Sequence, residues 1–348
     1  MRVAYHHPFP GTLNAHRVIY NGYKNAFGDL GHEFFTYSAG MDLASFLSRN
    51  RPDLFVTASH FLWRKQLDYG VLKRFRDQGM RTLVRVDFWT SPLHAHRVNE
   101  ARSMSDDSEA VRLIRSGRMG DAFFHVTEQG DPRMEGFARG TGHPYHTIPL
   151  AADVTLMRHA PDARFKSDIA FIGTNLPQKR EFFRSYLFPL GKTYDLKLYG
   201  QDWTRRDRYL GYIQKLGQYL NLPVLRSIRK PRLELEDEAR IYSSSRILVN
   251  LHEDYQRRFG GDCNERTFKV PACGGFEIAD DVACIRNYFD DGDEIVIATG
   301  IDDWFDKIRY YSDHPDERTR IAGAGQARVL REHTYHHRAG AMLDLALM

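Results

Sequence analysis

The sequence predicts an α/β protein with two doubly wound domains, and three observations support this prediction. The chain has 348 residues, more than one hydrophobic core usually organises. Short apolar runs bounded by turn residues alternate with longer amphipathic segments. This alternation pauses near residue 160 and then starts again. Alternating strands and helices are typical of parallel sheets covered by helices on both faces.

The first half, residues 1–160, carries five β-like runs separated by helical patterns. They are "RVAY" (2–5), "EFFTY" (33–37), "LFVTA" (54–58), "TLVRV" (82–86) and "AFFHV" (122–126). We expect this half to form one domain around a parallel sheet.

The second half, residues 161–330, repeats the theme after a stretch that contains Pro and Ala. Its β-like runs are "DIAFIG" (168–173), "DLKLYG" (195–200), "RILVNLH" (246–252), "GFEIAD" (275–280) and "EIVIAT" (294–299). The tail, residues 331–348, has apolar residues three or four apart, which predicts a final helix.

The composition is that of a globular protein, with 42% hydrophobic and 27% charged residues. No run of about 18 apolar residues predicts a membrane span, and the N-terminus lacks a signal-peptide pattern. We therefore expect a cytoplasmic location, with peripheral membrane contact left open. Three cysteines without metal or redox spacing are expected to be reduced thiols.

The net charge of +4 suits an anionic small molecule, and we expect no nucleic-acid partner. A dedicated nucleic-acid binder would more often show a clustered basic stripe. The one candidate stripe is "RSIRKPR" (226–232). It is read as a solvated loop, with nucleic-acid binding as the alternative.

Polar and glycine turns follow the strands of the second half, where an open parallel sheet binds its ligands. These turns contain Gly173 with Thr174, Tyr199 with Gly200, and Asn250 with His252. A glycine after a strand lets backbone amides approach a phosphate. Each turn is therefore a candidate part of a phosphate site, although many turns between a strand and a helix contain a glycine.

The stretch "NERTFKVPACGG" (264–275) predicts a helix start that faces an anion. Asn264 or Asp262 could cap it, the amides of residues 265–267 would be free, and Arg266 adds a fork suited to phosphate oxygens. The alternative is that Arg266 pairs with a carboxylate and the glycines only end a helix.

The ordered blocks "SSSRILVNLHED", "NERTFKVPACGGFEIADD" and "YFDDGDEIVIATG" resemble the C-terminal domain of the CgeB-like glycosyltransferases. The resemblance spans roughly residues 165–340, and for the N-terminal half it is only architectural. It implies the GT-B fold, with two facing Rossmann-like domains and a C-terminal helix that crosses back to the first. It also implies transfer of a sugar from a nucleotide-diphosphate donor.

The resemblance assigns donor-binding roles to residues of the second domain. Asn264, Arg266 and Thr267 would face the phosphates, together with the turn of Gly173 and Thr174, and Tyr199 and Gly200 belong to the next strand end. The remaining assignments are Arg180 as a second cation and Asn250 and His252 beside the sugar pocket.

Two departures from the family pattern concern the ribose contact. Lys269 and Gly261 stand where relatives place glutamates, so Glu265 becomes a candidate for holding the ribose. Lys269 joins Arg266 as a candidate catalytic cation for the leaving diphosphate.

The first half is expected to hold a carbohydrate-type acceptor, in the loops "HHPFPGTLN" and "DFWTSPLHAHR". Asp87 and His94 are of the types used as general bases. His7, Gly11, Trp89 and His96 are expected on the acceptor side. A loop histidine can equally be a surface or packing residue, and Trp89 can be core.

The sequence thus predicts a glycosyltransferase without metal or cofactor, whose co-substrate is a nucleotide-diphosphate sugar. Cations and helix amides would stabilise the leaving group. The alternatives are a nucleotide-sugar epimerase on the same fold and a degenerate protein that only binds nucleotide sugars.

Overall fold

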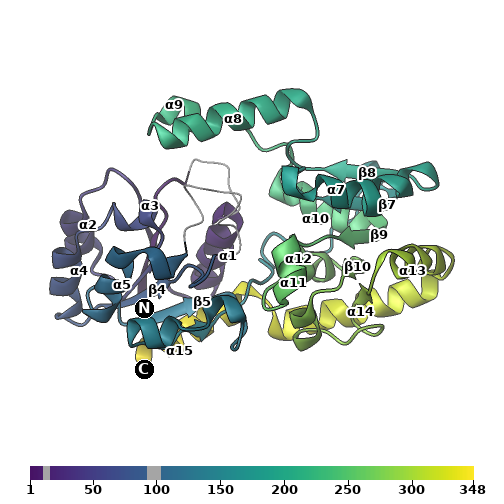
Figure 1. Cartoon of the computed structure of the whole chain (residues 1–348). Coiled ribbons are helices and arrows are strands. Elements are labelled where there is room, and N and C mark those ends of the chain that lie inside the picture. Colours follow the sequence, from purple (N-terminus) through teal and green to yellow (C-terminus); the bar gives the residue numbers. More distant parts are fainter. Residues whose placement is uncertain (11–15, 92–102) are drawn as a thin grey trace. The chain divides into compact units, whose positions relative to one another are not determined.

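The computed structural model describes residues 1–10, 16–91 and 103–348 (Figure 1). They divide into two compact units. The first contains Met1–Pro10, Tyr23–Pro149 and His336–Met348, and the second contains Leu150–Tyr335 with the beginning of the first helix. The predicted boundary near residue 160 therefore lies inside the second unit.

The first unit is built on a six-stranded parallel sheet in the order β2-β1-β3-β4-β5-β6. Its central strands are buried because they read as continuous apolar runs; all of β3 lies in the interior. The strands are β1 (Arg2–His6), β2 (Glu33–Tyr37), β3 (Leu54–Ala58), β4 (Arg81–Arg85), β5 (Ala122–His125) and β6 (His146–Thr147). The two-residue β6 was not predicted.

Helices follow these strands, and several begin at an aspartate that caps free backbone amides. Asp42, Asp68 and Asp107 each accept from amides of the first helical turn. The helices are α1 (His16–Asp29), α2 (Leu43–Asn50), α3 (Phe61–Arg64), α4 (Tyr69–Arg76), α5 (Ser108–Arg115), α6 (Phe137–Thr141) and α15 (Tyr335–Leu347). Of α15, all residues from His336 on belong to the first unit.

The second unit is built on a five-stranded parallel sheet in the order β11-β10-β9-β7-β8. Its strands are β7 (Ser167–Ile172), β8 (Leu196–Tyr199), β9 (Ser245–Asn250), β10 (Glu277–Asp280) and β11 (Val296–Ala298). The sheet has one hydrophobic cluster around Phe268 and Tyr242 and another around Trp304 and Phe171. Two parallel sheets with helices confirm the predicted α/β class.

The helices of the second unit include a pair, α8 and α9, that projects from the sheet after β8 (Figure 1). They are α7 (Arg180–Phe182), α8 (Arg205–Tyr219), α9 (Pro223–Arg226), α10 (Leu235–Ser244), α11 (Asp254–Phe259), α12 (Arg266–Ala272), α13 (Ile301–Asp313) and α14 (Pro315–Glu332). In the described part of the chain no helix is long and apolar enough to cross a membrane.

Gly275, between α12 and β10, has no room for a side chain. A Cβ atom there would lie 2.5 Å from Leu248 Cδ1 and 2.7 Å from the Tyr242 carbonyl oxygen. We expect Gly275→Ala to lower the free energy of unfolding by about 1–3 kcal/mol, because the backbone must shift. Gly323→Ala in α14 is the control, since nothing lies within 4 Å of its Cβ position. Urea unfolding of both variants measures the difference, and equal stability would contradict the close fit at Gly275.

Candidate functional site

The strand order of the second sheet places its switch point between β7 and β9. From β7 the chain adds β8 on one side and then returns to add β9 on the other. In open parallel sheets, ligands bind at such a point, outside the carboxyl ends of the strands. We call the ends of β7, β8 and β9 with the start of α12 the candidate donor site.

The two predicted glycine turns meet at this edge of the sheet. The Gly173 amide donates to the Tyr199 carbonyl at 3.0 Å. A Cβ atom on Gly200, whose φ is +111°, would lie 2.5 Å from the Gly173 carbonyl oxygen. The second turn therefore needs glycine at Gly200, and Thr174 continues the first turn with its carbonyl accepting from Leu176.

Arg266 bridges the switch point through its guanidinium group. Its Nη1 donates to the Ile172 carbonyl and its Nη2 to the Leu251 carbonyl, both at 2.9 Å. Its Nε donates to Asn250 Oδ1 at 3.0 Å. These bonds join the ends of β7 and β9. They use one N–H of Nη1 and one of Nη2, so each of these two nitrogens has a second N–H that takes no part in them. Arg266 is thus a structural bridge as well as a charge, which the sequence did not predict.

Asn250, at the end of β9, is the centre of a buried hydrogen-bond network. Its Oδ1 accepts from Arg266 and, at 2.9 Å, from Asn264 Nδ2. Its Nδ2 donates to Thr267 Oγ1 at 3.1 Å and to Glu277 Oε1 at 2.7 Å. Asn250 is 0% exposed, so its side chain serves to orient its neighbours at this strand end.

His252 and Thr267 are also buried, in contrast to their predicted contact with the donor. His252 Nδ1 lies 2.6 Å from Asp280 Oδ1, and its Nε2 lies 3.2 Å from Thr267 Oγ1. Burial lowers the pKa of His252 even though the Asp280 carboxylate opposes this shift. The imidazole is therefore neutral and positions Thr267 in α12.

The start of α12 is not the free helix end that the sequence predicted. Asn264 Oδ1 accepts from the Arg266 amide at 2.9 Å, so this amide is not free for a ligand. The helix has only seven residues, which limits the dipole at its N-terminus. Any attraction for an anion must come mainly from side-chain cations.

Lys269 and Glu265 are both engaged within the unit. Lys269 is buried, and its Nζ lies 2.5 Å from Glu238 Oε2. Burial lowers the pKa of Lys269, but the Glu238 and Glu265 carboxylates outweigh it and raise that pKa. The Glu265 carboxylate accepts from Tyr335 Oη at 2.7 Å. Lys269 is therefore not a free catalytic cation, and Glu265 is not a free ribose ligand.

A buried cation that the sequence analysis missed lies beside the predicted Arg180. Lys179 Nζ donates to the Leu251 carbonyl at 3.1 Å and lies 3.2 Å from Glu253 Oε1. Burial, and then the Arg266 charge, lower the pKa of Lys179 to about 8. Its place in "PQKR" directly after the β7 turn was the signal that could have found it.

Two polar atoms near this turn have no hydrogen-bond partner among the described residues. They are Arg180 Nε and Asn175 Oδ1, and both atoms are buried. A buried donor or acceptor without a partner is costly. These atoms therefore mark a place where a polar ligand would be stabilised.

The predicted acceptor residues of the first unit differ in how deeply they are buried. His7 is buried, and burial followed by the Arg85 charge lowers its pKa to about 4, so it is not a surface contact. Asp87 is half-buried just after β4, where its amide donates to Ser59 Oγ at 2.9 Å. Trp89 packs against Gly136 and Gly140. Gly11, His94 and His96 lie outside the described residues.

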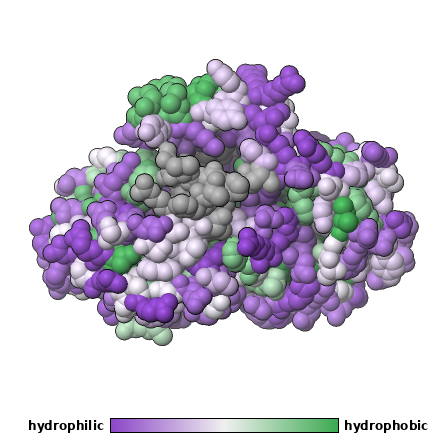
Figure 2. All heavy atoms as spheres, in the orientation of Figure 1, coloured by the Kyte–Doolittle hydropathy of each residue, from purple (hydrophilic) through white to green (hydrophobic). Residues whose placement is uncertain are grey.

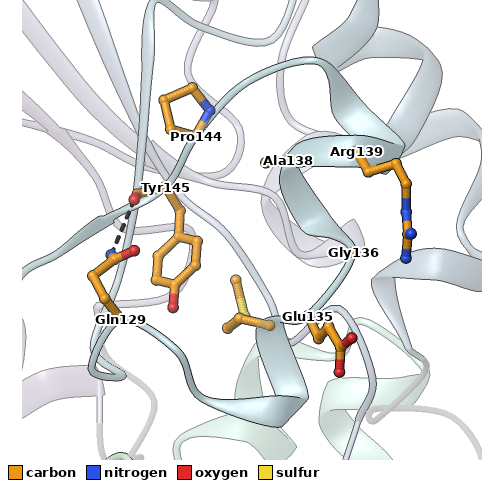
Figure 3. Close-up of a pocket in the computed structure, with 8 residues that line it drawn as sticks. Gln129, Glu135, Gly136, Ala138, Arg139, Pro144 and Tyr145 are labelled. Carbon is orange, nitrogen blue, oxygen red and sulfur yellow. Dashed lines mark hydrogen bonds between the residues drawn. The ribbon is translucent and has the colours of Figure 1, made fainter.

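Two open hollows flank α6 of the first unit. One, of about 380 Å³, has Gln129, Arg139 and Tyr145 in its wall, and Gln129 Nε2 donates to the Tyr145 carbonyl on one side of it (Figure 3). The other, of about 650 Å³, is lined by Trp89 and Arg112 among others. Because Trp89 lines this hollow, it stays a candidate for stacking on a sugar. Across residues 1–10, 16–91 and 103–348, no three His, Cys, Asp or Glu side chains are grouped to hold a metal ion.

Glu277 should make stability depend on pH. Burial raises the pKa of Glu277 to about 8, above the ordinary value of 4.5. The unfolded carboxyl ionises first, so the contribution of Glu277 to stability is greatest below about pH 4.5 and falls as pH rises to about 8. The slope approaches 1.4 kcal/mol per pH unit for one proton. Glu277→Gln keeps the acceptor for Asn250 and should flatten this slope in urea unfolding. The exposed Glu181→Gln variant should keep it, and a wild-type slope in Glu277→Gln would reject the assignment.

The Lys269–Glu238 pair predicts a charge-reversal rescue. Lys269→Glu places a carboxylate against Glu238 and should cost about 3–5 kcal/mol, as for a broken buried pair. Adding Glu238→Lys restores opposite charges and should recover at least half of that loss. A double-mutant cycle by thermal unfolding measures this coupling. Additive losses would mean that the two groups do not interact.

Part of the chain is similar to known proteins. Residues 179–344 match the family model described as glycosyl transferase-like. The spore protein CgeB of Bacillus subtilis (strain 168) is 22% identical over 204 residues, which cover 54% of this chain and 57% of that protein's length.

Solved structures match over nearly the whole chain. A sucrose-phosphate synthase from Thermosynechococcus elongatus has a TM-score of 0.62 and 13% identity, with 99% of this chain and 98% of that chain covered. An alpha-glucosyltransferase in complex with UDP and a 13-mer DNA has a TM-score of 0.64 and 13% identity, with both chains fully covered. These likenesses confirm the GT-B fold. Residues 179–344 therefore resemble a glycosyl transferase-like family, and the predicted resemblance to the CgeB-like glycosyltransferases of GT-B fold is confirmed.

Proposed function

We propose that the protein transfers a sugar from a nucleotide-diphosphate donor to a carbohydrate-type acceptor, and that the switch point of the second sheet holds the diphosphate. The observation that supports this most is the pair of cations there. Lys179 and Arg266 both donate to the Leu251 carbonyl. Two positive charges held at one carbonyl repel each other, and an anionic ligand would relieve that repulsion.

The charge balance at this site favours an anion. Lys179 has Glu253 as a partner, whereas no carboxylate in the described ranges forms an ion pair with Arg266. Arg180 adds a guanidinium with a buried Nε that lacks an acceptor within those ranges. Phosphate oxygens would supply such acceptors.

In the proposed reaction, the bond between the anomeric carbon and the diphosphate oxygen breaks as the acceptor oxygen bonds to that carbon. Negative charge develops on the leaving diphosphate, and the cations stabilise it without a metal. The acceptor hydroxyl must lose its proton to a base. Asp87, after β4 of the first sheet, is our candidate for this role.

A protein that binds nucleotide sugars without transferring them is the second candidate. The Lys269–Glu238 pair favours it, because the position that carries a glutamate in relatives is here a buried, paired lysine. Both candidates predict nucleotide binding. Only the transferase predicts loss of the sugar from the donor when acceptor sugars are supplied.

Binding of UDP, GDP, dTDP and ADP to the purified chain tests the site by calorimetry. We expect Arg180→Ala to weaken binding of the preferred diphosphate by about 1.5–3 kcal/mol, the value of a charge-assisted bond, and to leave binding of the nucleoside unchanged. Arg184→Ala is the matched control, because Arg184 is exposed a few residues further along the chain. Arg266→Ala should weaken binding at least as much and also destabilise the strand ends.

Three outcomes would count against the proposal. The first is that none of the diphosphates binds. The second is that Arg180→Ala binds the diphosphate like the wild type, and the third is that Arg180→Ala weakens binding of nucleoside and diphosphate equally. The first rejects the nucleotide site, and the others remove Arg180 from the phosphates.

A further inference from the structure

The positive charge of the protein is concentrated in one helical hairpin. We define the basic hairpin as residues 203–232, which include α8, α9 and the connecting turn. It has eight Lys or Arg residues and one Asp, a net charge of +7. Because the whole chain carries +4, all other residues together carry −3. The run "RSIRKPR" is part of this hairpin.

The outer face of α8 carries an exposed apolar stripe. Tyr209, Tyr212, Leu216 and Tyr219 are spaced by three, four and three residues, which places them on one face of the helix. They are exposed by 66%, 65%, 51% and 77%. Val224 in α9 is 79% exposed. Figure 2 shows a green apolar patch at the α9 end of the hairpin.

Basic side chains flank this stripe. Arg208 and Lys215 each precede a stripe residue by one position, so they lie together on one side of it. Arg206 lies toward the opposite side, and both Arg206 and Lys215 are exposed. A helix with an apolar stripe between basic borders is typical of a helix that lies in a membrane interface.

The inner face of the hairpin is held by separate contacts. Gly217 lets α9 approach closely, since a Cβ there would lie 2.5 Å from Leu225 Cβ. Arg229 forms ion pairs with Asp202 at 2.6 Å and Asp207 at 3.0 Å. The single acid of the hairpin is thus used inside it. The exposed stripe is not part of these contacts.

We propose that the basic hairpin binds the surface of an anionic lipid bilayer. Apolar side chains such as Leu216 and Val224 gain free energy when they leave water for the acyl region. Tyrosines suit the headgroup level, and each nearby Lys or Arg adds attraction to anionic lipids. This inference goes beyond the proposed sugar transfer and does not depend on it.

A bilayer fits this face better than the two other occupants. A nucleic acid would pair with the basic borders but would leave the aliphatic residues without an apolar partner. A second copy would bring two surfaces of +7 together, and like charges repel. Of these three occupants, the anionic bilayer is the one that offers negative charge and an apolar layer together.

Sedimentation of the full chain with lipid vesicles tests the proposal. We expect binding to vesicles of phosphatidylcholine mixed with phosphatidylglycerol to be at least about tenfold tighter than binding to phosphatidylcholine alone, and to weaken with added salt. Leu216→Asp with Val224→Asp should reduce binding about tenfold or more. The matched control is Leu330→Asp, because Leu330 in α14 is 50% exposed.

A second variant tests charge separately from apolar contact. Lys215→Glu should weaken binding to the mixed vesicles, whereas Lys192→Glu, at an exposed position outside the hairpin, should not. The proposal is overturned if the wild type binds neither type of vesicle. It is also overturned if Leu330→Asp weakens binding as much as Leu216→Asp with Val224→Asp. Binding to a DNA or RNA duplex without vesicle binding would also overturn it. So would a dimer that Leu216→Asp dissociates in the absence of any vesicle binding.

Discussion

The side-chain amide of Asn250 has all of its hydrogen-bonding capacity used inside the second unit, and the candidate donor site depends on that. Its oxygen accepts two bonds and its nitrogen donates two, the most that an amide group can make. The four partners come from the start of α12 and from β10. One buried side chain therefore fixes the helix that carries Arg266 relative to the strand ends. Because a broken member would leave several buried groups without partners, the arrangement is restricted to a single geometry.

The second unit contains several charged side chains that are buried in its interior. Lys269 is compensated by Glu238, and Asp280 by Arg257 at 3.4 Å. Lys179 is only partly compensated, and Arg266 donates to neutral carbonyls and an amide oxygen. The residual positive charge is thus left at the switch point, whereas the deeper charges cancel. This division separates groups that build the site from groups that can attract an anion.

Most of the fold could be predicted from the sequence, because strand and helix periods are local properties. The two glycine turns could also be predicted, since a glycine directly after a strand commonly allows a tight turn. β6 was missed because two residues carry no period. The roles of Asn250, His252 and Thr267 could not be predicted, because exposure depends on tertiary contacts. Arg266 was predicted to lie at the right strand ends, but its carbonyl partners come from distant segments. Lys269 was misread for the same reason, since Glu238 lies far from it in the sequence.

Trp203 joins the basic hairpin to the sheet. Its indole N–H is shared between the Gly173 carbonyl at 2.9 Å and the Tyr199 carbonyl at 3.1 Å. Its ring packs near Phe183 and Phe171, with centroids 5.5 Å and 6.1 Å away. The start of the hairpin is therefore fixed to the sheet by the hydrogen bonds and aromatic packing of one side chain. Because Trp203 ties the hairpin to the sheet, a surface that binds the hairpin also sets the angle at which the strand ends of this sheet approach that surface.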